Sequence, residues 1–234
     1  MSKLKDCFEE GWWNALKPYL ESKDFKDLGK KLVFESKDKI ITPKFSDTFN
    51  AFKYCPYRKI NTIILGTDPY PGMIDSGIYV ADGLAFSSKY SRSCPKSLNY
   101  IQEAISEDVY NGDNYMIGTN WNLRSWAEQG ILLLNCALTF PIGGKTGDHV
   151  DLWSPFIAHV LRTVNKEKDA VGVILMGAYA KAFKPIFTNP TYMITECEHP
   201  SRANYRGGRW EHNGVFKQLH SYHKTFNNIE INWE

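Results

Sequence analysis

Residues 62–72 read TIILGTDPYPG, a short apolar run that ends in a loop of glycine, aspartate and proline. Three later segments repeat this arrangement of an apolar run followed by polar residues, at 131–134, 171–176 and 192–195. Apolar runs of this length, bounded by turn-forming residues, are typical of buried strands. Segments with helical spacing lie between and after the runs, at 97–105, 120–129, 153–165, 179–187 and about 211–223. Strands that alternate with helices predict a parallel sheet with helices on both faces.

The chain shows no internal repeat, no low-complexity tract and no linker, so we expect one domain over residues 1–234. Its first part, residues 1–44, carries apolar side chains at helical spacing, as in Phe8, Trp12 and Leu16, and we expect an N-terminal helical segment there. A content of 43% hydrophobic and 23% charged residues is ordinary for a globular protein and excludes disordered and fibrous classes.

Charge and cysteine usage limit the partners and the location. The formal net charge of +2 neither requires nor excludes a nucleic-acid partner, because a local basic patch is enough. No run of about 18 apolar residues is present, and the N-terminus has acidic residues where a signal peptide needs an apolar stretch. We therefore expect no membrane association and an intracellular protein, in the cytoplasm, nucleoid or nucleus. The five cysteines form no CxxC pair and the six histidines show no compact ligand spacing, so neither a disulfide framework nor a metal site is expected.

Polar residues follow the predicted strands at the edge where open parallel sheets bind ligands. Asp68 follows the first run, Asn135 the second and His199 the fourth. Asp68 is either a turn cap or a carboxylate that orients water or faces a developing cation. Asn135 is either a turn-former or an amide that reads the edge of a flat heterocycle. His199 is either a satisfied loop residue or a neutral hydrogen-bond donor to an oxyanion.

Four motifs then appear in a recognisable order: GTDPYP, GLAFS, LLLNCALT and HPS. With TFNAFKYCP, CPKSLNYIQE, GDHVDLW, MGAYAKAF and a terminal INW, they resemble the family 1 uracil-DNA glycosylases over residues 45–234. The resemblance implies a single α/β domain with a central, mainly parallel four-stranded sheet flanked by helices. It also implies a hydrolase of base excision repair, which cleaves the bond joining uracil to deoxyribose in DNA, leaves an abasic site, and uses no metal or organic cofactor.

The resemblance assigns roles to individual residues. Asp68 matches the aspartate that positions the attacking water and faces the cationic sugar, and His199 the histidine that hydrogen-bonds uracil O2. Asn135 matches the asparagine that pairs with uracil N3–H and O4. Phe86 matches the aromatic residue on which the flipped base stacks, although an apolar residue in this position would otherwise be assigned to the core. Tyr70 matches the tyrosine whose ring leaves no room for the thymine methyl.

Further matches concern the backbone and the DNA strand. Thr67 occupies the place of a glutamine whose backbone helps to hold the base. Ser97 and Ser201 match serines that bind DNA phosphates, while Pro69 and Gly72 lie in the water-activating loop and are expected at the DNA interface.

Two departures from the family pattern affect the DNA-binding edge. The segment PGMIDSGIYVAD, residues 71–82, starts with Pro71 in place of a histidine and adds about five residues, which we expect to lengthen the lip of the pocket. Ala203 stands where the family has a leucine that wedges into the duplex, so Arg202 or Tyr205 could take its place. Arg202, Arg206 and Arg209, together with Tyr205 and Trp210, form a basic and aromatic stretch suited to a DNA backbone, or else an exposed loop with solvated arginines.

The changed loop and Pro71 motivate an alternative from another class. The fold could serve as a DNA-binding or replication-processivity component with weak or vestigial activity, as in poxvirus relatives. A glycosylase with another base preference is a third reading, which Tyr70 and Asn135 oppose. The expected partners are single- or double-stranded DNA containing uracil, and a DNA-mimicking inhibitor protein or a replication partner stays open. We expect a monomer.

Overall fold

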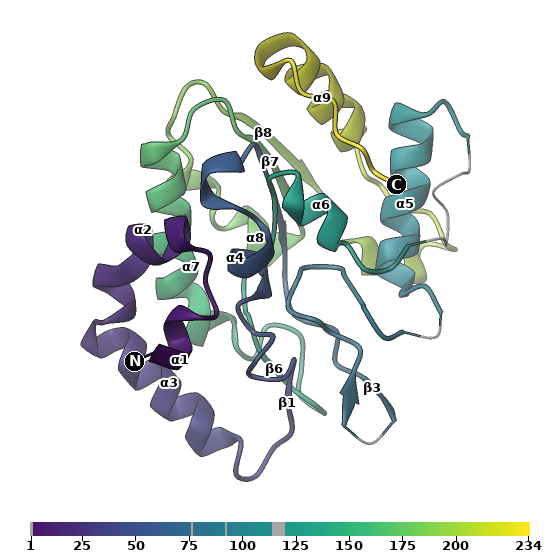
Figure 1. The fold of residues 1–234 in the computed structure, drawn as a ribbon. Coiled ribbons are helices and arrows are strands. Elements are labelled where there is room, and N and C mark those ends of the chain that lie inside the picture. Colours follow the sequence, from purple (N-terminus) through teal and green to yellow (C-terminus); the bar gives the residue numbers. More distant parts are fainter. Residues whose placement is uncertain (1, 76, 92, 114–119) are drawn as a thin grey trace.

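The structure, a computed structural model, describes residues 2–75, 77–91, 93–113 and 120–234 (Figure 1). Its centre is a sheet of four parallel strands in the order β5-β2-β7-β8. The strands are β2 (Thr62–Gly66), β5 (Ile131–Asn135), β7 (Gly172–Met176) and β8 (Met193–Cys197). The predicted α/β fold with a four-stranded parallel sheet is therefore confirmed, and each strand begins and ends within two residues of its predicted run.

The first three of these strands are buried along their whole length, which is why they appear in the sequence as uninterrupted apolar runs. Gly66 pairs with Asn135 at the ends of β2 and β5, and Met176 pairs with Cys197 at the ends of β7 and β8. All four strands end at the same edge of the sheet. The loops that follow them consequently meet there.

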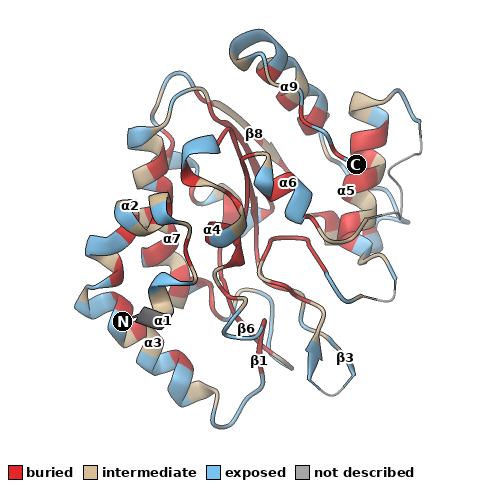
Figure 2. Ribbon diagram, in the orientation of Figure 1, coloured by how far each residue is buried: buried red, intermediate tan, exposed pale blue. Residues whose placement is uncertain are grey.

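Helices cover both faces of the sheet, with α2, α3 and α7 on one side and α5 and α9 on the other (Figure 1). Figure 2 shows the buried residues gathered on the strands and on the helix faces turned toward them. The helices are α1 (Ser2–Lys5), α2 (Glu10–Leu20), α3 (Lys23–Glu35), α4 (Asn50–Tyr54), α5 (Lys96–Val109), α6 (Arg124–Glu128), α7 (Val150–Glu167), α8 (Ala178–Lys181) and α9 (Val215–Tyr222). The helix predicted over 179–187 is shorter: α8 ends at Lys181, and a 3₁₀ turn at Lys184–Ile186 follows. Pro185 lies in that turn and lacks the N–H that a continuing α-helix would need.

The N-terminal helices pack into the same core as the sheet. Trp12, Leu16 and Leu20 line the buried face of α2, and the Trp12 indole N–H donates to the carbonyl of Cys55 at 2.9 Å. Beyond α3, strand β1 (Ile41–Thr42) pairs antiparallel with β6 (Phe140–Pro141). This pairing brings the N-terminal segment to the edge where the central strands end.

The added segment between Tyr70 and Gly83 forms a small antiparallel hairpin of β3 (Met73–Asp75) and β4 (Ile78–Tyr79). It stands at the same end of the molecule as β1 and β6 (Figure 1). Met73 and Ile78 are exposed. None of the described helices is both long and apolar enough to cross a membrane.

Candidate functional site

A pocket of about 420 Å³ opens where the central strands end. The predicted site residues that line it are Thr67, Asp68, Pro69, Tyr70, Phe86, Ser97, His199, Ser201 and Arg202. The other lining residues are Pro71, Phe140, Thr146, Gly177, Ala178 and Tyr179. Four predicted residues do not line it: Gly72, Asn135, Tyr205 and Arg206. The structure therefore brings the predicted carboxylate, imidazole and aromatic groups into one cavity, at the edge that the strand pattern indicated.

Asp68 lines this pocket, and one of its two carboxylate oxygens has a hydrogen-bond partner. Its Oδ2 accepts a hydrogen bond from the Gly147 backbone N–H at 2.9 Å, whereas its Oδ1 is buried and has no partner among the described residues. Burial raises the pKa of the Asp68 carboxyl, and the Gly147 N–H and His149 act in the opposite direction. The loop around it is fixed, because the Cys136 N–H donates to the Gly66 carbonyl at 3.0 Å and extends the strand ladder into the loop. A buried oxygen without a partner is a binding position for water or for a cation.

His199 is held as a neutral hydrogen-bond donor. The Ser201 backbone N–H donates to its Nδ1 at 3.3 Å, and the Ser201 hydroxyl lies 2.9 Å from the same nitrogen. Since Nδ1 accepts, we assign the ring proton to Nε2. Burial lowers the pKa of His199 to about 4, so the ring is uncharged at neutral pH. The β7 strand is followed by Gly177, at φ +92°, where a Cβ would lie 3.0 Å from the Cβ of His199.

Phe86 presents an aromatic face beside His199, with their ring centroids 5.6 Å apart. Its backbone has φ +65°, a strained value for a phenylalanine. Three hydrogen bonds hold this turn: Ala85 N–H to the Leu133 carbonyl at 3.1 Å, Ser88 N–H to the Trp121 carbonyl at 2.7 Å, and the Tyr70 hydroxyl to the Phe86 carbonyl at 3.1 Å. Backbone strain that the surroundings enforce is a common feature of binding sites.

Asn135 lies next to Phe86, beside Gly66. A Cβ built on Gly66 would be 2.5 Å from Asn135 Oδ1 and 3.0 Å from Phe86 Cζ. The absence of a side chain at Gly66 is what allows the carboxamide and the ring edge to come together. Asn135 is 7% exposed, and its carboxamide atoms are not among the fully buried polar atoms that lack a partner in the described part of the chain. An amide in this position is able to hydrogen-bond a flat ring that stacks on Phe86.

The loop after His199 forms a 3₁₀ helix, Pro200–Tyr205, and its side chains point in different directions. Ala203 is fully buried, whereas Tyr205 is 81% exposed. The Arg202 guanidinium lies 5.9 Å from the centre of the Tyr205 ring. Arg206 forms ion pairs with Glu198, at 3.0 Å, and with Glu211. Arg206 is therefore bound to two carboxylates of the protein and differs from Arg202, which faces the pocket.

Gly72 lies outside the pocket at the base of the hairpin. Its carbonyl accepts a hydrogen bond from the Val80 N–H at 3.0 Å, and a Cβ on it would be 3.2 Å from Val80 Cγ2. The structure thus places Gly72 at the start of the hairpin, hydrogen-bonded to Val80 at its other end.

Sequence reasoning missed the role of Gly147. Its φ is +88°, which favours glycine, and a side chain there would collide with the Tyr179 hydroxyl. The position therefore requires glycine for two independent reasons. Its N–H reaches Asp68, 79 residues earlier in the chain. Every residue except proline has a backbone N–H, so a backbone donor cannot be recognised from the sequence. The glycine of the GDHVDLW segment is the one feature that could have indicated this position. Among the described residues, no group of three or more histidine, cysteine or acidic side chains is arranged to hold a metal ion.

Comparisons with known proteins agree with this geometry. The chain is 35% identical over 192 residues to the uracil-DNA glycosylase of Deinococcus radiodurans, which covers 82% of this chain and 74% of the relative. It is 31% identical over 231 residues to the uracil-DNA glycosylase of Bacillus anthracis, covering 99% and 98% of the two chains.

Solved structures and a family model point the same way. The crystal structure of mimivirus uracil-DNA glycosylase superposes with a TM-score of 0.84 at 25% identity and covers 98% of this chain and 88% of that one. A structure of a mimivirus UNG variant in complex with UGI has a TM-score of 0.83 at 25% identity, covering 97% and 88%. The model of the Uracil DNA glycosylase superfamily matches residues 52–221, which is most of the chain. With relatives above 30% identity along almost its whole length, the chain belongs to the uracil-DNA glycosylase superfamily.

Proposed function

We propose that this protein is a uracil-DNA glycosylase, a hydrolase that cleaves the N-glycosidic bond of deoxyuridine in DNA and acts in base excision repair. It releases free uracil and leaves an abasic site. The observation that carries the proposal is one pocket that contains both a carboxylate with an unpartnered oxygen, Asp68, and a neutral imidazole whose Nε2–H is free to donate, His199.

The chemistry requires both groups. The target nucleotide leaves the base stack and enters the pocket, which costs a few kcal/mol. As the C1′–N1 bond breaks, its electron pair leaves with the uracil and positive charge develops on the sugar. A water molecule adds to C1′ and transfers a proton to Asp68, whose negative charge faces the sugar. His199 donates its Nε2–H to uracil O2 and stabilises the departing anion. Because burial lowers the pKa of His199 to about 4, the ring acts at neutral pH as an uncharged hydrogen-bond donor.

Base selection uses Phe86, Tyr70 and Thr67 of the pocket lining, together with Asn135, which lies next to Phe86. Uracil stacks on Phe86, and the Asn135 carboxamide accepts from N3–H and donates to O4, which cytosine, lacking both, does not satisfy. The Tyr70 ring, fixed through its hydroxyl, occupies the space that a thymine methyl would need. Thr67 contributes backbone at the end of β2 that helps to hold the base.

The DNA strand is held around the pocket mouth. Ser97 lies in the first turn of α5, where unpaired backbone N–H groups favour a phosphate, and Ser201 lies in the first turn of the loop after His199. Pro69 and Arg202 line the same opening, and Gly72 sets the path of the hairpin beside it.

The wedge that fills the gap in the duplex is Tyr205. Ala203, at the leucine position, is fully buried and does not reach DNA, whereas Tyr205 is 81% exposed and carries an aromatic face able to stack. Arg202 lies close to that ring and adds positive charge for the backbone. Arg206, with its charge offset by Glu198 and Glu211, supports the shape of the loop and adds little to phosphate binding.

The same proposal covers the partners. Residues 1–234 act as one domain, since the N-terminal helices and the sheet share one core. The proposal takes this domain to act as a monomer. The substrate is uracil-containing DNA, single- or double-stranded, which places the activity inside the cell. A structural neighbour is solved in complex with UGI, and a DNA-mimicking inhibitor protein that covers the pocket mouth fits this chain as well.

The test is release of uracil from a labelled oligonucleotide in EDTA, followed by alkali to cleave abasic sites. Wild-type protein is expected to cleave strands that contain uracil and to leave matched strands with thymine or cytosine intact. An intact uracil strand, beside a control glycosylase that cleaves it, would rule the proposal out.

A further inference from the structure

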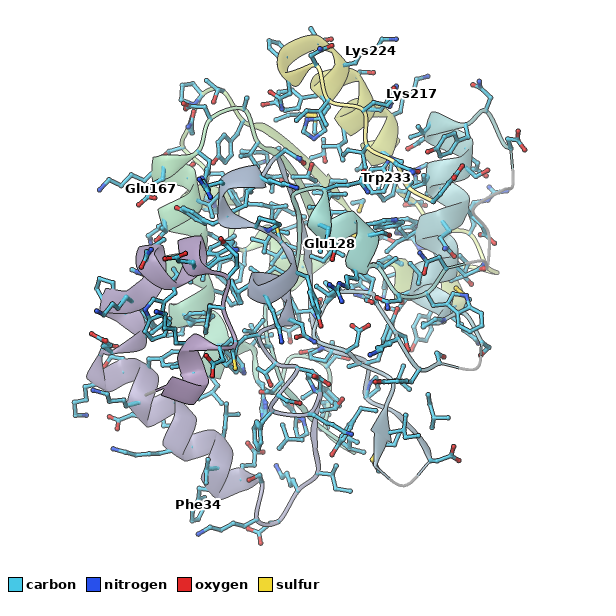
Figure 3. All side chains as sticks on the ribbon, in the orientation of Figure 1. Phe34, Glu128, Glu167, Lys217, Lys224 and Trp233 are labelled. Carbon is cyan, nitrogen blue, oxygen red and sulfur yellow. The ribbon has the colours of Figure 1, made fainter. Side chains whose placement is uncertain are left out.

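Glu35 is turned toward the protein at the end of an otherwise exposed stretch of α3. Val33 is 59% and Phe34 is 68% exposed, and Figure 3 shows Phe34 projecting from the end of the helix. The Glu35 side chain is only 26% exposed. One of its oxygens forms an ion pair with Lys39 Nζ at 2.8 Å, and the other lies 2.9 Å from His149 Nε2. Lys39, and after it His149, lower the pKa of Glu35, so its carboxylate is charged at neutral pH.

His149 is fixed at both ring nitrogens. Its side chain is 4% exposed, and its Nδ1 lies 2.8 Å from the Thr139 hydroxyl. That hydroxyl already accepts a hydrogen bond from the Trp153 indole N–H at 2.7 Å, which leaves its own proton free to point at Nδ1. The ring proton then lies on Nε2 and faces Glu35. An imidazole bonded on both sides in a buried site has one orientation.

The turn that follows Pro141 connects His149 to Asp68. His149 is the first residue before α7, and its carbonyl accepts the Trp153 N–H at 3.0 Å. Two residues earlier, the Gly147 carbonyl accepts the Val150 N–H at 2.9 Å while the Gly147 N–H donates to Asp68. His149 and the Gly147 donor thus lie two residues apart in the same hydrogen-bonded turn.

The anchor comes from the N-terminal segment, outside the part of the chain that the family model matches. That match begins at residue 52, and Glu35 precedes it. The same segment contacts the turn a second time, because β1 pairs with β6 and the Ile142 N–H donates to the Ile40 carbonyl at 2.8 Å. Residues 35–42 thus hold the turn from two sides.

We propose that Glu35 and His149 are positioning residues for Asp68: the pair fixes the turn whose Gly147 N–H orients the carboxylate and leaves Oδ1 directed at the water. This inference rests on the proposed function of Asp68. It gives the N-terminal helix α3 a part in catalysis through the turn at Gly147.

The test compares three variants: Glu35→Ala, Glu35→Gln and Asp27→Ala. Gln keeps an acceptor for His149 Nε2–H, and Asp27 is a matched control on the same helix, where it pairs with Lys23 and Lys30. Single-turnover uracil release is measured with enzyme in excess, and affinity is measured on a duplex with a tetrahydrofuran abasic analogue. Glu35→Ala is expected to slow release by roughly 10- to 100-fold with unchanged affinity, since a displacement near 1 Å at a reacting group costs up to about 10²-fold. Glu35→Gln is expected to recover most of the rate, and Asp27→Ala to equal the wild type.

The second arm repeats Glu35→Ala in an Asp68→Asn background. If Glu35 acts through Asp68, the two losses are not additive and the double variant is as slow as Asp68→Asn alone. An equal loss in both backgrounds would overturn the inference, as would an unchanged rate in Glu35→Ala. A lower unfolding temperature with an unchanged rate per folded molecule would show a merely structural role.

A third readout does not depend on activity. Amide hydrogen exchange at Gly147 is expected to be faster in Glu35→Ala than in the wild type and unchanged in Asp27→Ala. A wild-type protein that releases no uracil would refute the proposed function, while the Gly147 exchange would still decide whether Glu35 anchors the turn. Equal exchange in all three proteins contradicts the inference.

Discussion

Replacing Asp68 by asparagine separates catalysis from stability, and we expect the two to change in opposite directions. The asparagine Oδ1 keeps the Gly147 N–H bond, so the loop geometry is retained and only the charge is removed. The pocket then loses its anion toward the sugar and its acceptor for the water proton. Loss of one preorganised electrostatic group typically lowers the rate by about 10²–10³, which is roughly 2.7–4 kcal/mol of barrier.

Stability is expected to rise at neutral pH. Burial raises the pKa of Asp68 above that of an unfolded chain, so the folded state binds the proton more tightly. The contribution of Asp68 to the free energy of unfolding is therefore greatest below its pKa in the unfolded chain. It is lost as pH rises through its higher pKa in the folded protein. Asparagine carries no such penalty. The advantage of Asp68→Asn should be greater at pH 7 than at lower pH, because it shrinks as pH falls through the raised pKa of Asp68.

The assays are single-turnover uracil release at pH 7 and thermal unfolding at pH 7 and pH 4.5. A slow variant that unfolds at or above the wild-type temperature supports the account. Release at the wild-type rate would remove Asp68 from its role. A slow variant that is also less stable at pH 7 would attribute the loss to misfolding and refute the reasoning about burial.

Three further predictions concern other parts of the pocket. Because burial lowers the pKa of His199 to about 4, its ring nitrogens should show no titration by NMR between pH 8 and 6, and an inflection near 6.5 in that titration would mean a solvated ring. Gly66→Ala places a methyl 2.5 Å from Asn135 Oδ1 and should displace the carboxamide. We expect competitive inhibition by free uracil to weaken by about tenfold or more, which corresponds to a loss of ~1.4 kcal/mol in binding free energy. Unchanged inhibition would show that Asn135 does not take part in base binding. Tyr205→Ala should slow release from double-stranded DNA by about 10-fold or more and spare single-stranded DNA, since loss of one stacking contact is worth about 1–3 kcal/mol; equal loss on both substrates would exclude a wedge.

The sheet could be predicted from the sequence because three of its four strands, β2, β5 and β7, are buried along their whole length. A short run such as 62–65, followed by turn-forming residues, indicates a buried strand. The observed strand β2 is one residue longer than this run. The parallel arrangement then places Asp68 and His199 at one edge without further information. Helix ends were predicted less well: α9 begins at Val215, where 211 was expected.

Contacts made by backbone or between distant segments could not be predicted. The Gly147 N–H has no residue-type signature, and Glu35 and His149 are 114 residues apart with nothing in their spacing to link them. The length of the segment between Tyr70 and Gly83 indicated an extension, but not its hairpin. The direction of Tyr205 depends on which residues of a 3₁₀ turn face the core, and a turn of six residues is too short for a periodic pattern.

The most direct measurement is the intact mass of an oligonucleotide with a single deoxyuridine before and after incubation with the protein. The account predicts a product lighter by uracil and heavier by one water, with free uracil in the supernatant and no change in a thymidine strand. An unchanged mass under these conditions would contradict the central claim that this pocket hydrolyses the bond between uracil and deoxyribose.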